Sequence, residues 1–457
     1  MRVVFLFLLF AFSNSLYAQN VADKLENAWQ KFESDSQLRS ALSSLYVVNA
    51  KNGTVVFDKN SRIGLATAST LKIVTAASAY ELLGKDFRYE TKFGYLGKVK
   101  SNILYGSLYV QSVGDPTLGS WRWKTTKDSF VLGEISEAMQ RVKIKSYGGS
   151  ININEWVGER IPDGWIWEDL GNYYGAGAAA FNWRENQVDV LLKSGTKIGD
   201  RVEIVTLEPK TSTPMLQSFA TSAAKGTGDN AYVYFPLGSS NGVVRGTIPI
   251  NENNFKISAS MPNPALFFSQ SLSNYLIVKN KMTSVHYEGV SEDTTFLFSH
   301  LSPSVDSIVY WFLKRSINLY GEALVKTIAY QNAGIGSTEK SVELVKKYWK
   351  DKGIDPVELN MVDGSGLSPL NRVTTHAQVQ VLQYAKNQPW FSGYYDAFPV
   401  YNEMKMKSGT IRGVKGFCGY QKAKDGSEYI FSFLVNNYNG SSASLIQKMY
   451  KVLDELK

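Results

Sequence analysis

The sequence is poor in cysteine and histidine, and these scarcities exclude several kinds of protein. Cys418 is the only cysteine, so no disulfide can form within the chain, and its cores must hold it together. Its apolar strand-like surroundings predict a buried thiol. The histidines His286, His300 and His376 show no metal-ligand spacing, and no phosphate-binding Gly-Lys-Ser/Thr loop occurs. We therefore expect neither a metal nor another cofactor.

The chain also lacks a block of basic residues. Its 49 Lys and Arg against 41 Asp and Glu give a net charge of +8 that is spread along the sequence, so we predict no nucleic-acid partner. Hydrophobic residues make up 44% and charged residues 20%, as in folded soluble proteins. A length of 457 residues is too great for one simple core, so two or more domains are expected.

The single long apolar run lies at the N-terminus. It spans Val3–Phe12, after the positive charge of Arg2, and the small residue Ala18 follows it. This pattern indicates a secretory signal peptide, because a membrane-spanning helix would need roughly 20 apolar residues. We expect residues 1–18 to be removed on export, which changes the net charge from +8 to +7. The mature chain is then expected to have no stable membrane span.

The two ends of the chain carry alternating helix and hairpin patterns. Near the start, β-rich runs flank Asn52-Gly53, which favours a hairpin turn. An apolar helical stretch follows from Ala68 to Leu83, with Gly84 as its stop. Toward the other end we predict helices at 304–313, 319–330, 338–352 and 444–456 and β runs at 411–420 and 429–435.

The middle of the chain has a different character. Short β-rich segments alternate there with glycine turns. We therefore predict a multi-domain α/β protein in which residues 19–86 and 299–457 form one domain. Residues 87–298 would be a mainly β insertion with two nested subdomains.

Ser69 and Lys72 are the first candidates for chemistry. They stand three residues apart at the start of a predicted helix, so they share one face. The positive end of a helix favours an alkoxide, and a lysine partly buried beside an apolar run can lose its proton and act as a base. Such a pair needs no histidine, and the sequence contains no Gly-x-Ser-x-Gly elbow.

Two further motifs follow in chain order. Ser316-Ile317-Asn318 lies between two predicted helices, where a loop can direct a hydroxyl and an amide into a cleft. Lys407-Ser408-Gly409-Thr410 opens the β run at 411–420 and offers an amine, hydroxyls and a glycine that permits close backbone approach.

Each short motif has decoys. The Ser-x-x-Lys spacing recurs at Ser194, Ser222 and Ser337, so spacing alone decides nothing. What distinguishes Ser69 is its place before a long apolar helix and the order of the motifs that follow. Ser-x-x-Lys, then Ser-x-Asn, then Lys-Ser/Thr-Gly is the set shared by penicillin-binding proteins and serine β-lactamases.

The chain resembles the class C low-molecular-mass penicillin-binding proteins, the D-alanyl-D-alanine carboxypeptidase/endopeptidases, over most of its mature length. The separation of 247 residues between Ser69 and Ser316 (316 − 69) is similar to the large insertion of these enzymes. Four further segments match family signatures: Gly-Asp-Pro-Thr-Leu at 114–118, Gly-Trp-Ile-Trp-Glu-Asp-Leu at 164–170, Asn-Leu-Tyr-Gly-Glu-Ala-Leu at 318–324 and Asp-Gly-Ser-Gly-Leu-Ser at 363–368.

The resemblance implies a penicillin-binding, serine β-lactamase-like α/β domain with a central antiparallel sheet flanked by helices, split by a large mainly β insertion. It also implies a role for each motif. Ser69 would be acylated after Lys72 takes its proton, while Ser316 relays a proton to the leaving amine. Asn318 would hold the substrate backbone.

The third motif would bind the substrate's end. Lys407 and Ser408 would engage the terminal carboxylate, and the backbone N–H groups of Ser69 and Thr410, on either side of Gly409, would form the oxyanion hole. Serine replaces the family's usual threonine at Ser408, and because the hydroxyl is kept we expect no loss of activity.

Outside the trio, the resemblance implies fewer roles. Asp169 would meet the amino group of a diaminopimelate stem peptide, with a surface or capping acid as the alternative. We interpret Asp363 and Ser365 as part of a glycine-built turn rather than as catalytic residues.

The implied activity is that of a DD-peptidase in the periplasm or cell envelope of a bacterium. It would cut D-Ala-D-Ala ends, cross-links or both in peptidoglycan stem peptides, and β-lactam antibiotics would inhibit it covalently. Two alternatives stay open: a β-lactamase on the same framework, and a non-catalytic peptidoglycan-binding scaffold.

Overall fold

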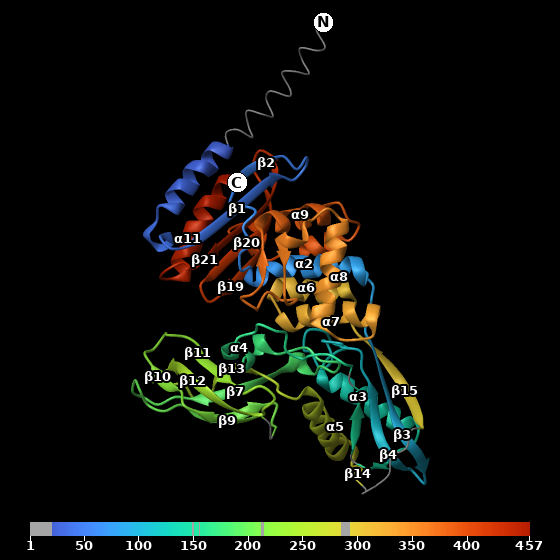
Figure 1. Ribbon diagram of the computed structural model, residues 1–457. Helices are drawn as coiled ribbons and strands as arrows, with labels where there is room; N and C mark the ends of the chain where they lie inside the picture. Colours follow the sequence, from blue (N-terminus) through green and yellow to red (C-terminus); the bar gives the residue numbers. More distant parts are fainter. Residues whose placement is uncertain (1–20, 149, 155, 212–213, 285–292) are drawn as a thin grey trace. The chain divides into compact units, whose positions relative to one another are not determined.

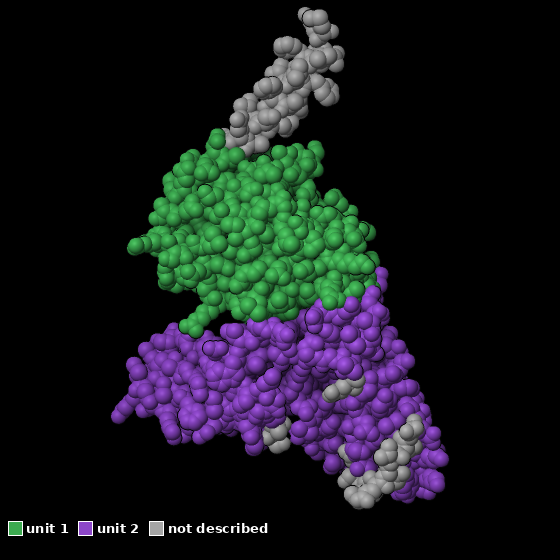
Figure 2. Space-filling view, viewed as in Figure 1, with its two compact units in different colours: residues 1–85, 308–317, 342–457 green, residues 86–307, 318–341 purple. Residues whose placement is uncertain are grey.

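The computed structural model describes residues 21–148, 150–154, 156–211, 214–284 and 293–457 (Figure 1). The predicted signal peptide, residues 1–18, lies outside the described residues. The chain divides into two compact units (Figure 2). Unit 1 comprises residues 1–85, 308–317 and 342–457, and unit 2 comprises residues 86–307 and 318–341. The domain boundaries proposed from the sequence, including the two nested subdomains, stay a prediction.

Unit 1 is built on a six-stranded antiparallel sheet with the strand order β18-β19-β20-β21-β1-β2. Strands β1 and β21 pair over their whole length, from Leu42 opposite Asn436 to Asn49 opposite Tyr429. The first and last parts of the chain therefore share one sheet. The strands are β1 (Leu42–Asn49), β2 (Val55–Lys59), β18 (Val400–Tyr401), β19 (Met404–Ile411), β20 (Val414–Lys422) and β21 (Glu428–Asn436), and a separate pair is β16 (Leu359–Asn360) and β17 (Arg372–Val373).

Helices cover both faces of this sheet. On one face, the helix of residues 21–33 and α11 pack through a cluster that includes Trp29, Phe433 and Met449. On the other, α9 contacts β1 and β21 and is itself packed on α2. The helices are η1 (Ser36–Leu38), η2 (Ala68–Leu71), α2 (Lys72–Leu82), η5 (Pro356–Glu358), α9 (Thr375–Lys386), α10 (Phe391–Asp396), α11 (Ser442–Leu453) and η6 (Asp454–Leu456), while α6 (Val305–Arg315) and α8 (Thr338–Asp351) cross the division between the units.

Most local predictions for the chain ends are confirmed. The hairpin around Asn52-Gly53 is β1 and β2, and the helix after Ala68 ends at Leu82, with Gly84 at a φ of +90°. The helices predicted after residue 304 correspond to α6, α7 (Asn318–Ala333), α8 and α11. The thiol of Cys418, in β20, is fully buried as predicted.

The β run predicted at 411–420 is wrong in one respect. The structure breaks it at Arg412-Gly413, where Ile411 pairs with Val414 and Gly413 has a φ of +71°. A two-residue hairpin turn of this kind favours glycine, because its positive φ is costly for other residues. The Lys407–Thr410 motif therefore lies inside a separate strand, β19, instead of opening the run.

The described residues of unit 2 form three sheets. Their strand orders are β14-β5-β4-β3-β15 with β6 on β4, β13-β7-β8, and β10-β12-β11 with β9 on β12. The strands are β3 (Glu90–Lys100), β4 (Ile103–Gln111), β5 (Ser146–Tyr147), β6 (Ile151–Ile153), β7 (Gln187–Lys193), β8 (Glu203–Glu208), β9 (Met215–Ser218), β10 (Thr221–Ala223), β11 (Asn230–Tyr234), β12 (Asn241–Pro249), β13 (Phe255–Ser260), β14 (Thr283–Ser284) and β15 (Thr294–Leu301).

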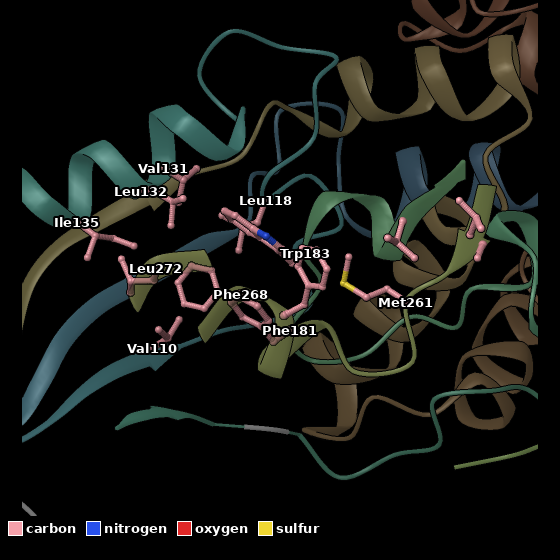
Figure 3. Close-up of a cluster of buried hydrophobic side chains, with 14 of the residues drawn as sticks. Val110, Leu118, Val131, Leu132, Ile135, Phe181, Trp183, Met261, Phe268 and Leu272 are labelled. Atoms are coloured by element: carbon pink, nitrogen blue, oxygen red, sulfur yellow. The ribbon is translucent and has the colours of Figure 1, made fainter. Parts of the chain in front are cut away.

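Between residues 87 and 298, unit 2 also contains helices that the mainly β prediction did not specify. The longer ones are α5 (Pro264–Asn280) and α3 (Asp128–Arg141), and the short ones are α4 (Trp167–Leu170), η3 (Tyr173–Gly175) and η4 (Arg184–Asn186). The predicted helix α7 also belongs to unit 2. Figure 3 shows α3 and α5 contributing to one buried cluster with β4. In it, the Phe268 ring lies 4.9 Å from Trp183 and 5.0 Å from Phe181, centroid to centroid.

Among the described residues, no helix has both the length and the apolar composition that crossing a bilayer requires.

Candidate active site

Ser69 and Lys72 lie at the junction of η2 and α2. The Lys72 ammonium nitrogen is 2.8 Å from the Ser69 hydroxyl oxygen and 2.6 Å from the backbone carbonyl oxygen of Ser365. Lys72 is fully buried, whereas Ser69 is partly exposed. The preceding Ala68 has a φ of +46°, a strained conformation for a residue with a side chain. The junction thus holds a reachable hydroxyl against a buried amine at the positive end of a helix.

The loop that follows Met361 positions the Ser365 carbonyl oxygen, which accepts a hydrogen bond from Lys72. The carboxylate of Asp363 accepts hydrogen bonds from the backbone N–H groups of Gly366 and Ser368 and from the Asn371 amide. A Cβ on Gly366 would lie 1.9 Å from the Ala68 carbonyl oxygen, so only glycine lets the loop pack on the nucleophile turn. The segment folds back on itself around the Asp363 carboxylate, and the contact of the Ser365 carbonyl with Lys72 is one that the sequence did not reveal.

Ser316 and Lys407 form a second pair. Ser316 sits between α6 and α7 with a φ of +58°, and its hydroxyl is 2.9 Å from the Lys407 ammonium, which also donates to the Ser408 carbonyl oxygen at 2.7 Å. Burial lowers the pKa of Lys407 to about 7; the Cys418 thiol opposes this shift, and the Lys415 charge adds to it. Ser316 therefore touches a cation that exchanges its proton near neutral pH.

Strand β19 passes close to the nucleophile turn. A Cβ on Gly409 would lie 2.6 Å from the Thr67 carbonyl oxygen and 3.0 Å from the backbone nitrogen of Ser69, so this position requires glycine. The N–H of Met406 donates toward β18, to Pro399. Because N–H directions alternate along an antiparallel strand, the N–H groups of Ser408 and Thr410 point to the same edge.

Asn318 and Asp169 belong to unit 2, and each forms a hydrogen bond with Tyr174. Asn318, the first residue of α7, donates from its amide to the Tyr174 carbonyl oxygen at 2.8 Å. The Tyr174 hydroxyl hydrogen-bonds the Asp169 carboxylate in α4. Burial, reinforced by Glu168, raises the pKa of Asp169 to about 6 despite that hydrogen bond. Glycine at position 175 allows the backbone to approach Asp169 closely, because a Cβ there would lie 1.9 Å from the Asp169 carbonyl oxygen.

In each of the other three Ser-x-x-Lys segments, the serine hydroxyl accepts a hydrogen bond from a backbone N–H group. The Ser194 hydroxyl accepts from the N–H of Glu252, and the Ser222 hydroxyl accepts from the N–H of Gly195. The Ser337 hydroxyl accepts from the N–H of Lys340 at the start of α8. Only the first of the four motifs has its serine hydroxyl on its own lysine in the described residues.

Comparison with known proteins identifies the family of the chain. Residues 25–456 match the family model described as the D-Ala-D-Ala carboxypeptidase 3 (S13) family. The chain belongs to this family. The S13 match covers both chain ends and the insertion, and therefore every candidate site residue.

Individual S13-like relatives are distant in sequence. The D-alanyl-D-alanine carboxypeptidase of Actinomadura sp. (strain R39) is 26% identical over 90% of this chain and 81% of its own length. The D-alanyl-D-alanine carboxypeptidase DacB of Haemophilus influenzae is 22% identical over 86% and 84% of the two chains.

Solved structures show the same fold. The crystal structure of penicillin-binding protein 4 from Haemophilus influenzae aligns with a TM-score of 0.78 at 20% identity, over 94% of this chain and 98% of that one. A second structure of that protein, complexed with a novel β-lactam, aligns with a TM-score of 0.73 at 19% identity, over the same shares of the two chains. The predicted penicillin-binding α/β fold is thereby confirmed.

Proposed function

We propose that this S13 family member is an exported serine DD-peptidase that cleaves D-alanyl-D-alanine ends or D-alanyl cross-links of peptidoglycan stem peptides. The observation that carries the proposal is the 2.8 Å contact between the Lys72 amine and the Ser69 hydroxyl, in a helix start that also receives the Gly409 backbone. A serine next to a buried amine is an activated nucleophile that needs no histidine.

The reaction would begin with acylation of Ser69. Lys72 takes the hydroxyl proton as the Ser69 oxygen attacks the carbonyl carbon of the penultimate D-alanine. The C–N bond to the next residue breaks, and the leaving nitrogen receives the proton that Lys72 took, relayed through the Ser316 hydroxyl, so that Lys72 becomes neutral again. Lys407 holds the Ser316 hydroxyl in place. Water then hydrolyses the ester and regenerates the serine.

The backbone near Ser69 supports an oxyanion hole. Gly409 approaches the Ser69 nitrogen closely, and the Thr410 N–H points to the open edge of β19. Two N–H groups in this position would stabilise the negative oxygen of the tetrahedral intermediate, a contribution of about 3–4 kcal/mol per donor in other enzymes. Lys407, Ser408 and Thr410 would receive the terminal carboxylate beside it.

Asn318 and Asp169 would recognise the rest of the stem peptide. The carboxylate of Asp169 suits an ammonium group on the stem-peptide side chain, and the Asn318 amide suits the peptide backbone. Their shared contact with Tyr174 supports a common role for the two residues.

The test of the proposed function is labelling with a fluorescent penicillin. The wild-type protein should form a stable adduct on Ser69, and Ser69→Ala should form none while its circular dichroism spectrum and melting temperature stay unchanged. Equal labelling of both proteins would overturn the assignment. An adduct that turns over rapidly would identify a β-lactamase instead.

Mass spectrometry of muropeptides after incubation tests the substrate. Loss of D-alanine from pentapeptides identifies a carboxypeptidase, and separation of cross-linked dimers identifies an endopeptidase. Unchanged muropeptides together with retention on purified peptidoglycan would instead identify a non-catalytic scaffold.

The proposal includes the domain division and the destination of the chain. Residues 19–86 and 299–457 would form the catalytic domain, interrupted by residues 87–298. We expect residues 1–18 to be removed on export, so that the secreted protein starts at Gln19. Mass spectrometry of the N-terminal peptide of the protein from cell-envelope fractions would detect this start. An N-terminus at Met1 would contradict export by cleavage.

A further inference from the structure

Lys415 is a buried cation that the proposed mechanism leaves unused. It lies on β20 directly opposite Thr410 in the register of the β19–β20 pair. Its ammonium nitrogen donates to the Thr410 hydroxyl oxygen at 2.8 Å and stands 4.8 Å from the centroid of the Phe417 ring. Only 6% of Lys415 is exposed, so this side chain is held in place at the rim of the third motif.

No carboxylate of the described residues balances this charge, because burial is the only influence on the pKa of the Lys415 ammonium and no ion pair of Lys415 is present there. Burial alone lowers its pKa, to about 8. Lys407, on the neighbouring strand, is also buried, and Lys415 contributes to the lowering of its pKa. Two buried cations without an anion are costly, and an incoming carboxylate would relieve that cost.

The hydrogen bond also fixes the role of the Thr410 hydroxyl. A lysine ammonium has donors and no acceptor, so the Thr410 oxygen must accept from it. The hydroxyl's own hydrogen can therefore point toward a ligand, and Thr410 is exposed. The contact turns Thr410 into a dedicated donor toward a ligand, with a positive charge directly behind it.

We propose that Lys415 is a positioning residue that sets the preference of the site for substrates ending in a free carboxylate. It holds the Thr410 hydroxyl as a donor and adds a second positive charge to that of Lys407. The inference rests on the proposed function, because it assumes that the third motif receives the substrate's terminal carboxylate. A cross-link whose acyl acceptor carries no nearby carboxylate would gain nothing from Lys415.

The test compares two probes that differ only at this end, N-acetyl-D-alanyl-D-alanine and its C-terminal amide. Lys415→Met keeps the length and apolar stem of the side chain but removes the charge. We expect it to raise KM for the free acid at least about tenfold, with kcat changed less than threefold, and to leave the amide's kinetics unchanged. Lys415→Arg should restore most of the preference, because it again donates to Thr410 with a positive charge.

Lys422→Met is the matched control, since Lys422 is exposed at the end of the same strand. It should leave both probes unaffected. If Lys415→Met raises KM equally for the acid and the amide, or changes KM for neither, the inference is overturned.

Binding of the same probes to the Ser69→Ala protein, measured by calorimetry, separates this inference from the proposed function. A preference for the acid that disappears with Lys415→Met supports the role of Lys415 even if the wild-type protein hydrolyses nothing. Equal affinity for acid and amide would refute that role even if Ser69 is acylated by penicillin.

Discussion

At the scale of single residues, the candidate site depends on atoms whose partners are remote in sequence. The pairing of Ser69 with Lys72 could be predicted, because three residues at a helix start share a face. The Ser365 carbonyl on Lys72 could not, because no local pattern indicates which loop reaches a given side chain. The same holds for Ser316 and Lys407, which are 91 residues apart in sequence.

Gly409 allows a direct test of the close approach between β19 and the nucleophile turn. In Gly409→Ala, the added Cβ would lie 2.6 Å from the Thr67 carbonyl oxygen, so the strand must move away from Ser69. We expect the second-order rate constant for acylation by penicillin to fall at least about tenfold, because misplacement of catalytic groups by about 1 Å can cost 100-fold in other enzymes. Stopped-flow fluorescence measures this constant.

Gly133→Ala serves as the control for that substitution. Gly133 lies within α3, where a Cβ would meet only the Tyr275 hydroxyl at 3.6 Å. Alanine there should stabilise the protein by up to about 1 kcal/mol and leave acylation unchanged. An unchanged acylation rate in Gly409→Ala would show that the close approach is irrelevant to catalysis.

Asp169 predicts a pH dependence that belongs to substrate binding. Its pKa of about 6 means that the carboxyl is neutral below this pH and charged above it. For a stem peptide with a free side-chain amine, KM should therefore rise as the pH falls from 7 to 5, and it should do so less in Asp169→Asn. The same peptide acetylated on that amine is the control, and an identical pH profile for both peptides would contradict the recognition role.

At the scale of elements, local signals explain what could be predicted and what could not. The Asn52-Gly53 hairpin and the stop at Gly84 are local features, and the structure has both. Helix α5 carries a clear start, Asn263 capping Leu266 with Pro264 in the first turn, yet its apolar residues face all sides and give no helical period. The split between β19 and β20 depends on Gly413 alone, within a run that otherwise reads as a single strand.

Substitution of Asp363 tests whether its loop contributes to the stability of the fold, to the acylation of Ser69, or to both. In Asp363→Asn, the amide can accept on one side only, so a buried N–H of Gly366 or Ser368 loses its partner. We expect a loss of about 1–3 kcal/mol in the free energy of unfolding by urea. The acylation rate should fall as well, because the Ser365 carbonyl no longer holds Lys72 on Ser69.

Asp425→Asn is a suitable comparison, because Asp425 accepts a backbone hydrogen bond in an exposed turn far along the chain. It should change neither quantity appreciably. If Asp363→Asn lowers stability but leaves acylation at the wild-type rate, the loop supports the fold without orienting the lysine.

At the scale of the whole molecule, the chain contains two units with separate cores. Trp29 and Phe433 belong to the core of unit 1, and Trp183 and Phe268 belong to that of unit 2. Sequence patterns predicted the change of character along the chain but not the membership of each core, because the pairing of β1 with β21 joins segments nearly four hundred residues apart. Such non-local pairing is decided by packing rather than by local propensity.

Phe268→Ala tests how independent the two cores are. Removing a ring from a fully buried site should cost about 3–5 kcal/mol in unit 2. Calorimetry should show a lowered transition for unit 2, while the transition of unit 1 and the penicillin labelling of Ser69 at 25 °C stay as in the wild type. Phe433→Ala should have the converse effect on the two transitions. A single transition that shifts equally in both variants would show that the units unfold together.

The reactivity of Cys418, the only cysteine, can report on the opening of unit 1. The Cys418 thiol is fully buried on a central strand of unit 1, and burial raises its pKa well above the ordinary range. A thiol reagent therefore has one target, which becomes reactive only when the sheet opens. The modification rate in native buffer should give the opening free energy of that sheet at single-residue resolution, without denaturant and without any engineered probe.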